Sequence, residues 1–589
     1  MSEPQNLTKQ MISQVLTKPD SNLVTPIELA QDYYVDNFNY VLDHVCKRYQ
    51  DLFEPSFSHY VSNYQKLTLD GKRLLTRLCM RTGQWYEVCQ LNYGEISCLD
   101  TAISELTATE LVMQTSDVPV EVLASKLTVK RLKTLLADAF NISNKQLSGL
   151  KKPQLSELLI SQAELQPTQR LAHFLDSSWL ELQCQTEFDL LLLMFFGNGY
   201  QDLTQFVVAE LGLQRFYPYQ IDQQKRLFEH WHAVVQVQRL SELLEDFEAQ
   251  RRQMKLEDIK IFEGKSQLNP DSVAVALTGL SQYYLAKLRF NIARDYERKG
   301  FYRDAQELYQ QLDSTHATER IARIHFAEAN YSQALAEIDK VLELADLPAQ
   351  QRLVFQRLQY RCQRKLAIDV VKPEVDVKKI DIKLSAQQQQ AFKLGTESVE
   401  QQVVAHYQQR GLIAVHIENR LFCGLFGLYF WDIIFAPVKG AFQHPFQSAP
   451  SDMYRQDFIG HRSELIEQRL AQLQTHAPEA RINQAYEQYF GYINDWVDWK
   501  SVDISLLNQL LISVDRDFLN ALFRYFLQSL KNHRSGLPDL FVYRENQPGF
   551  ELIEVKSPTD KLQDNQIVWL DWLTQHGIEV SVCHVAYQL

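Results

Sequence analysis

The sequence predicts a multidomain, mainly α-helical chain that ends in an α/β domain with a mixed sheet. With 589 residues, the chain is too long for a single hydrophobic core. Apolar residues recur at helical spacing through most of the chain up to about residue 370. Beyond residue 540, two apolar runs, one helical pattern and a third apolar run follow one another, which is typical of an α/β domain.

Composition and charge are those of an ordinary globular protein, with 45% hydrophobic and 23% charged residues. The formal net charge of −13 argues against a uniformly basic nucleic-acid coat, although local basic grooves remain compatible with it. The eight cysteines form no CxxC pair, so we expect reduced thiols and no zinc site. Because there is no long apolar run and the N-terminus is polar, we expect a cytoplasmic protein without a membrane span or signal peptide.

Residues 1–115 are expected to form an N-terminal helical, DNA-binding region. Aromatic residues are frequent here, and lysines and arginines fall among them. Aromatic residues at helical spacing are more often core than base-stacking surfaces, so packing is the main alternative for them.

Residues 120–165 are expected to form a compact basic unit. Two amphipathic helices, Val129–Ala139 and Pro153–Ile160, flank a turn at Gly149. The pattern of leucines and lysines resembles the SAP DNA-binding motif, and a solvated basic face is the alternative. The candidate DNA-binding residues are Lys130, Arg131, Lys133, Lys151 and Lys152.

Residues 166–370 are expected to be helical and contain a weak internal repeat. Ala293, Tyr302 and Ala305 recur 29 residues later as Ala322, Tyr331 and Ala334. This resembles a shortened tetratricopeptide helix pair, in which small residues permit close packing. Residues 366–384 follow as an expected extended linker.

Residues 385–589 are expected to form the α/β domain. A helix should run through GTESVEQQVVAHYQQRG, with Glu397 and Glu400 near its start and Gly411 at its end. An apolar block and further helices follow up to Leu530. The expected final elements are strand Leu540–Tyr543, strand Phe550–Lys556, helix Gln563–His576 and strand Glu579–Tyr587.

Asp539, Glu554 and Lys556 fit the pattern Pro-Asp…Glu-x-Lys. Glu554 and Lys556 project from the same side of one strand. Carboxylate oxygens suit Mg²⁺, which polarises phosphate and activates water, and an ammonium can stabilise the charge that develops on the phosphate. The carbonyl of Val555 is a further candidate ligand. The alternative is a surface turn beside a strand-edge ion pair.

The segments around these residues resemble known nucleases. GLPDL, EVKSPTDKL and the residues Gln566 and Trp569 resemble the VRR-NUC branch of the PD-(D/E)xK nucleases. Together with SVEQQVVAHY, FGLYFWDIIF and VCHV, these segments occur in an order that resembles the Fanconi-anaemia-associated nuclease family. The resemblance extends over nearly the whole chain and implies a bacterial homologue. The resemblance implies Glu400 as one more acidic metal ligand and places Asp560 and Gln566 near the site.

The resemblance further implies a structure-selective nuclease that depends on Mg²⁺ or Mn²⁺, with two ions expected. Such enzymes cut 5′ flaps, resect from a 5′ end and act in interstrand crosslink repair, so the expected partner is branched or flapped duplex DNA. The family reads the 5′ end through a basic pocket, and an ordinary solvated face is the alternative here. The candidates are Lys287, Arg289, Arg294, Arg298 and His325.

Two other functions remain open from the sequence. Single-domain VRR-NUC proteins resolve four-way junctions, but the helical segment between Trp431 and Leu530 argues against such a dimeric resolvase. A helical DNA-binding scaffold with an inactive nuclease domain is the other, and intact Asp539, Glu554 and Lys556 argue against it. We expect a monomer, with a dimer still open, and association with the nucleoid if the source is bacterial.

Overall fold

The computed structural model describes residues 29–166, 171–174, 178–222, 225–266, 279–345, 347–371, 377–455, 457–545 and 547–587. The chain divides into two compact units. The first contains residues up to 40, 67–182 and 203–214, and the second contains residues 41–66, 183–202 and 215–589. Within the described ranges, no helix is long and apolar enough to cross a membrane. The predicted fold class is confirmed, and the predicted division into four domains stays a prediction.

The first unit combines short helices with a small antiparallel sheet. The sheet contains β1 (Trp85–Glu87), β2 (Val112–Thr115) and β3 (Trp179–Leu182), in the order β1-β3-β2. The all-helical expectation is therefore wrong at β1 and β2 within residues 1–115 and at β3 within 166–370, because strands this short show no clear two-residue period. Residues 1–28 of the expected N-terminal region lie outside the described chain. The helices here are α4 (Leu69–Cys79), α5 (Leu99–Ala108) and α11 (Thr204–Glu210), while α2 (Tyr33–Tyr49) contains the division between the units.

The basic unit at residues 120–165 is a cluster of four helices around leucines. They are α6 (Val120–Lys126), α7 (Val129–Phe140), α8 (Asn144–Leu147) and α9 (Lys152–Leu165). The two predicted helices correspond to α7 and α9, and the turn at Gly149 has the positive φ of 83° that favours glycine. Leu132, Leu136 and Leu155 are fully buried in one core, so this segment packs as a folded element.

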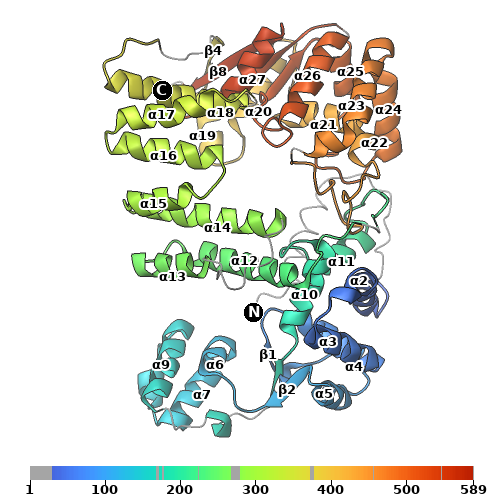
Figure 1. The fold of residues 1–589 in the computed structure, drawn as a ribbon, viewed down its shortest axis with the longest axis vertical. Coiled ribbons are helices and arrows are strands. Elements are labelled where there is room, and N and C mark those ends of the chain that lie inside the picture. Colours follow the sequence, from blue (N-terminus) through green and yellow to red (C-terminus); the bar gives the residue numbers. More distant parts are fainter. Residues whose placement is uncertain are drawn as a thin grey trace. The chain divides into compact units, whose positions relative to one another are not determined.

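The second unit contains a stack of helices that leads to the C-terminal domain (Figure 1). The repeat predicted from the sequence forms two helix pairs, and Ala293, Ala305, Ala322 and Ala334 are all fully buried. Small side chains at these positions let the helices approach closely. The helices before the domain are α3 (Pro55–Lys66), α10 (Gln185–Phe196), α12 (Trp231–Gln250), α13 (Leu256–Ser266), α14 (Gly279–Arg298), α15 (Tyr302–Tyr309), α16 (Thr315–Ala327), α17 (Tyr331–Leu342) and α18 (Ala349–Lys365).

A mixed five-stranded sheet, ordered β4-β8-β7-β6-β5, forms the centre of the C-terminal domain. The predicted strands β6 (Leu540–Tyr543), β7 (Phe550–Lys556) and β8 (Glu579–Tyr587) have the bounds expected from the sequence, and β6 and β7 pair antiparallel while β7 and β8 pair parallel. Strand β5 (Ile413–His416), which lies at one edge of the sheet, was not predicted from the sequence.

The expectation of a linker at residues 366–384 is wrong at its C-terminal end. Residues Lys378–Leu384 form the edge strand β4, which runs parallel to β8. Lys378 and Lys379 are exposed, whereas Ile382 and Leu384 are buried. Charged residues on an edge strand obscure its apolar period, and this is what made the segment resemble a linker. Residues 372–376 of the expected linker lie outside the described chain.

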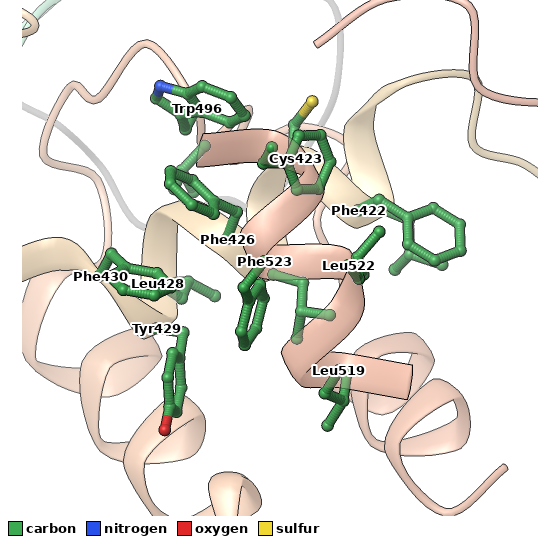
Figure 2. Packing of buried hydrophobic residues seen from close by; sticks show 14 of the residues in the cluster. Phe422, Cys423, Phe426, Leu428, Tyr429, Phe430, Trp496, Leu519, Leu522 and Phe523 are labelled. Carbon is green, nitrogen blue, oxygen red and sulfur yellow. The ribbon is translucent and has the colours of Figure 1, made fainter. Parts of the chain in front are cut away.

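Helices cover the sheet and enclose a large aromatic core (Figure 2). Phe426 packs against Trp496 with ring centroids 4.5 Å apart, and the rings of Tyr429 and Phe523 stack at 4.9 Å. The helices are α19 (Ala386–Lys393), α20 (Val399–Gln408), α21 (Arg420–Tyr429), α22 (Trp431–Ile434), α23 (Asp457–Thr475), α24 (Pro478–Tyr489), α25 (Ile504–Leu511), α26 (Arg516–Gln528) and α27 (Asp564–Gln575).

This core predicts opposite effects for two helical Gly→Ala substitutions. A methyl group at Gly427 in α21 would lie 2.7 Å from side-chain atoms of both Trp496 and Val497. Overpacking of this kind costs about 1–3 kcal/mol, which exceeds the gain in helix propensity. Gly427→Ala should therefore lower the stability of the C-terminal domain, measured by hydrogen exchange of the α21 amides.

The matched control is Gly460→Ala in α23, where no atom lies within 4 Å of the added methyl group. This substitution should stabilise its helix by about 0.5–1 kcal/mol because alanine restricts the unfolded chain and favours helix. Equal effects of the two substitutions would contradict the close packing of α21 against residues 496–497.

Candidate active site

Asp539 is fixed by backbone contacts immediately before β6. Its carbonyl accepts hydrogen bonds from the Ile417 and Glu418 amides at 2.8 and 3.0 Å, and its carboxylate accepts one from the Val555 amide at 2.8 Å. Gly536 begins this segment with a φ of 95°, and a β-carbon there would lie 2.7 Å from the carbonyl carbon of Asn565. A glycine is required for this close approach, which places Asp539 beside the end of β7.

Glu554 and Lys556 face the same side of β7, as the strand period predicts. Their carboxylate Oε1 and ammonium Nζ lie 2.8 Å apart, and both side chains are buried, with 0% and 8% exposed. Gln566 of α27 contacts both partners, donating to Glu554 Oε1 at 2.6 Å and accepting from Lys556 Nζ at 3.0 Å. The glutamine therefore connects β7 to α27.

The two carboxylates oppose each other's ionisation. Burial raises the pKa of Glu554 to about 8, and the neighbouring charge of Asp539 adds to the rise despite the Lys556 ammonium. Burial also raises the pKa of Asp539, against the lowering effect of the Val555 amide. Two acidic groups with raised pKa values at one point are typical of a functional site.

Glu400 of α20 is a further acidic residue that interacts with this group. It lies in the first turn of α20. Ser398 precedes this helix and caps it, because its hydroxyl accepts a hydrogen bond from the Gln401 amide. The charge of Glu400 contributes to the raised pKa of Asp539, so the two carboxylates are close enough to interact. Glu397 precedes the helix and is exposed.

One oxygen of the buried group fits a cation. Glu554 Oε2 is buried and has no hydrogen-bond partner in the described chain, although Oε1 has two. An uncompensated carboxylate oxygen is costly in a core, and a divalent cation with oxygen ligands would compensate it. In the part of the chain that the structure describes, no three His, Cys, Asp or Glu side chains already converge in a metal-binding arrangement. The donors that fit are thus two carboxylates together with backbone, Glu400 or solvent oxygens.

Two further residues lie around this group. Asp560, predicted near the site, accepts a hydrogen bond from the Ser557 hydroxyl at 2.6 Å in the loop after β7. His416 at the end of β5 interacts electrostatically with Asp539 and was missed by sequence analysis. The apolar run Ile413–Val415 was the available signal for that strand.

The basic candidates in the SAP-like unit differ in their contacts. Arg131 forms a two-point ion pair with the buried Glu87, at 2.5 and 2.6 Å, and so ties α7 to β1. The ammonium of Lys152 donates to the Ser125 carbonyl at 2.6 Å. Lys130 and Lys151 are exposed, and Lys133 is half-buried.

The basic row on α14 also separates into paired and unpaired side chains. Arg294 pairs with Glu297 at 2.6 Å, Arg298 pairs with Asp295 at 3.1 Å, and Lys287 lies 3.5 Å from Glu248. Arg289 is half-buried, and burial lowers its pKa. It has no ion pair within the described ranges, which makes it the strongest anion-binding candidate of the row.

His325 of α16 lies at a different point along the stack. Short connections make successive helices antiparallel, so α14 and α16 run in the same direction. Arg320 of α16 contacts Glu297 of α14 at 3.0 Å, which fixes their register. Because Arg289 precedes that contact and His325 follows it, an axial offset of roughly 20 Å separates them. The Nδ1 of His325 is buried without a partner among the described residues.

Comparisons with known proteins agree with this arrangement. A family model described as the VRR-NUC domain matches residues 474–587, and one described as the FAN1 HTH domain matches residues 32–113. The first match contains Asp539, Glu554 and Lys556, whereas Glu400 lies before it.

The relatives match the chain over nearly its whole length. A Fanconi-associated nuclease 1 homologue from Pseudomonas aeruginosa is 31% identical over 95% of this chain and 96% of its own length. The human Fanconi-associated nuclease 1 is 25% identical over 94% of this chain, which spans only 62% of the human protein. A crystal structure of paFAN1 bound to 5′-flap DNA with a 2-nucleotide flap and a gap superposes with a TM-score of 0.85 at 29% identity, covering 96% of this chain and all of that one. The chain therefore belongs to the Fanconi-associated nuclease 1 family and carries its VRR-NUC nuclease domain at residues 474–587.

Proposed function

We propose that the chain is a metal-dependent DNA nuclease that cuts 5′ flaps, resects from 5′ ends and acts in interstrand crosslink repair on chromosomal DNA. The observation that carries the proposal is the buried carboxylate pair beside an ammonium, with Glu554 Oε2 left without a partner. Support for the DNA substrate comes from paFAN1, which has been crystallised with 5′-flap DNA carrying 1- and 2-nucleotide flaps.

The side chains have distinct proposed roles. Asp539, Glu554 and Glu400, with the Val555 carbonyl, would hold Mg²⁺ or Mn²⁺ through oxygen, which both ions prefer. Two bound ions would supply Lewis-acid polarisation of the scissile phosphate and an activated water. Lys556 would place its ammonium against the negative charge that develops on the phosphate. Gln566 would keep Lys556 and Glu554 at the spacing observed here.

A proposed pocket on the helical stack would read the 5′ end. A terminal phosphate carries more charge than an internal diester and offers more oxygens to a planar guanidinium. Arg289 is the candidate because no acidic side chain in the described ranges neutralises it, whereas Arg294 and Arg298 already have carboxylate partners. Asp560 and the exposed lysines of the SAP-like unit remain lesser candidates for contacts near the site and with duplex DNA.

Glu554→Gln tests the metal site. The amide keeps the shape of the side chain and removes the charge, so cleavage of a 5′-flap DNA in Mg²⁺ should fall at least about 100-fold. Affinity for the same DNA in EDTA should not change, because Glu554 contacts no phosphate. The metal-free variant should be no less stable than wild type, since a buried charge has been removed.

Glu551→Gln on the same strand is the matched control, because Glu551 lies three residues earlier and forms a surface ion pair with Lys378. It should cleave at nearly the wild-type rate. A Glu554→Gln protein that cleaved as fast as this control would remove Glu554 from the active site.

Gln566→Leu tests the positioning of the ion pair. Removing the amide eliminates one contact to Glu554, one to Lys556 and one to the Gln563 amide that caps α27, so we expect kcat to fall about 10- to 100-fold with an unchanged KM for DNA. Gln575→Leu at the end of the same helix, where the amide contacts only Asp571, should be silent. An equal loss in both variants would indicate a general defect of α27.

Arg289→Ala tests recognition of the 5′ end. The measurement is the ratio of cleavage rates for a one-nucleotide flap with a 5′-phosphate and one with a 5′-hydroxyl. The ratio should exceed one in wild type and approach one in Arg289→Ala, while Arg298→Ala, an ion-paired arginine on the same helix, should keep the wild-type ratio. His325→Ala should also keep it, given the axial offset. If Arg289→Ala preserved the wild-type preference, the 5′-phosphate contact would lie elsewhere.

A further inference from the structure

A pocket in the first unit lies outside all the residues assigned above except the Arg131–Glu87 pair. It has a volume of about 160 Å³ and lies between the end of α4, strand β1, strand β3 and the end of α6. Its floor is aromatic and its exposed rim is cationic. The residues that define its chemistry are Arg81, Trp85, Tyr86, Glu87, Lys126 and Trp179.

The hydrogen-bonding groups around the pocket are unevenly satisfied. Trp179 is 1% exposed, yet its indole N–H has no acceptor among the described residues. An indole N–H can only donate, and a buried donor without a partner is costly. The Tyr86 hydroxyl, in contrast, donates to the Leu78 carbonyl at 2.8 Å. Trp179 lines the pocket, so an acceptor on a bound ligand would satisfy this N–H.

The charge at the pocket is positive. Glu87, its one lining acid, is already neutralised by Arg131 at 2.5 Å. Arg81 is exposed and has no ion pair in the described chain, and the Lys126 ammonium contacts only the Thr82 carbonyl, at 3.3 Å, and the Tyr86 ring. Two cations without acidic partners favour an anionic ligand.

The volume and the aromatic lining limit the ligand's shape. A protein cavity of about 150 Å³ accommodates benzene, so this pocket accommodates one six-membered ring and is too small for a purine. Trp85 of β1 is half-buried and lines the pocket, so its ring offers a flat ligand ring a surface to stack on. A ligand that has one six-membered ring, hydrogen-bond acceptors and a negative charge corresponds to a pyrimidine nucleotide.

We propose that this pocket holds one unpaired pyrimidine nucleotide of the bound DNA, with its ring on Trp85 and its phosphate on Arg81 and Lys126. The inference rests on the proposed function, because it takes the ligand from the DNA substrate. An acidic peptide would meet the cations equally well but would leave the aromatic surface unused. The pocket is a second, non-catalytic DNA contact that selects DNA with an unpaired nucleotide over continuous duplex.

The first test uses Trp179→Phe, which removes the indole N–H and keeps an aromatic ring. Because that N–H lacks a partner in the free protein, the substitution breaks no described hydrogen bond. Binding is measured in EDTA, so that it is independent of cleavage, on a nicked duplex and on the same duplex with one unpaired thymidine. Affinity for the thymidine-bearing DNA should fall about 3- to 10-fold, and affinity for the nicked duplex should not change.

The second test uses exposed residues, so it does not depend on the folding of Trp179→Phe. The exposed pair Arg81→Ala/Lys126→Ala should lower affinity for the thymidine-bearing DNA by about 10-fold. The control Arg303→Ala/Lys340→Ala removes the same charge from two exposed residues of the helical stack and should leave the preference for the unpaired thymidine unchanged. Replacing that thymidine by deoxyadenosine should weaken binding to wild type, as the pocket volume requires.

Photocrosslinking locates the nucleotide directly. DNA with 5-iododeoxyuridine at the unpaired position should crosslink to Trp85, and dCMP should compete better than inorganic phosphate or an acidic peptide. Equal competition by phosphate or the peptide would overturn the nucleotide assignment, as would wild-type affinity in both pocket variants. A wild-type protein that shows the pocket binding in EDTA but cleaves no flap in Mg²⁺ would overturn the proposed nuclease function alone.

Discussion

The burial of the Glu554 carboxylate is the constraint on which the active-site region depends. A fully buried carboxylate in the middle of a sheet needs compensation, and the strand provides one cation two residues later, on the same face. That pair accounts for one carboxylate oxygen only. The approach of Asp539, fixed by three backbone amides, adds repulsion instead of relieving it. Keeping the two carboxyl groups together therefore lowers the stability of the folded domain, which is typical of sites built for a cation.

Holding this group in place requires α27, and α27 is anchored at several points along its length. Its Trp569 is buried in the aromatic core and donates to the His533 carbonyl at 3.2 Å. At its N-terminus, Asp564 forms an ion pair with Arg357 of α18, the last helix of the stack. Since Gln566 follows Asp564 by two residues, the helical stack directly contacts the segment that holds the Glu554–Lys556 ion pair. The stack therefore also supports the helix that contacts the Glu554–Lys556 ion pair.

The sequence predicted the parts of this site that local patterns determine. Strands β6, β7 and β8 were found with their bounds because most of their residues are apolar. Glu554 and Lys556 then follow from their positions on β7, and Asp539 lies immediately before β6. Strands β1, β2, β3, β4 and β5 were missed because three to seven residues at an edge or in a small sheet leave little period. The ion pairs that fix how elements pack could not be predicted either. Nothing in the sequence indicates that Arg131 pairs with Glu87, or that Arg320 pairs with Glu297.

The distribution of ion pairs explains how a chain with an acidic net charge can bind DNA. Many arginines of this chain are committed to carboxylates, as Arg131 is to Glu87 and Arg294 is to Glu297. Such pairs shape the fold and contribute little field at a distance, because opposite charges a few ångströms apart cancel beyond the Debye length. The cations that remain uncompensated, such as Arg81 and Arg289, then define the local potential even though the whole molecule is negative. A phosphate backbone responds to that local potential, so the formal charge of −13 does not prevent DNA binding.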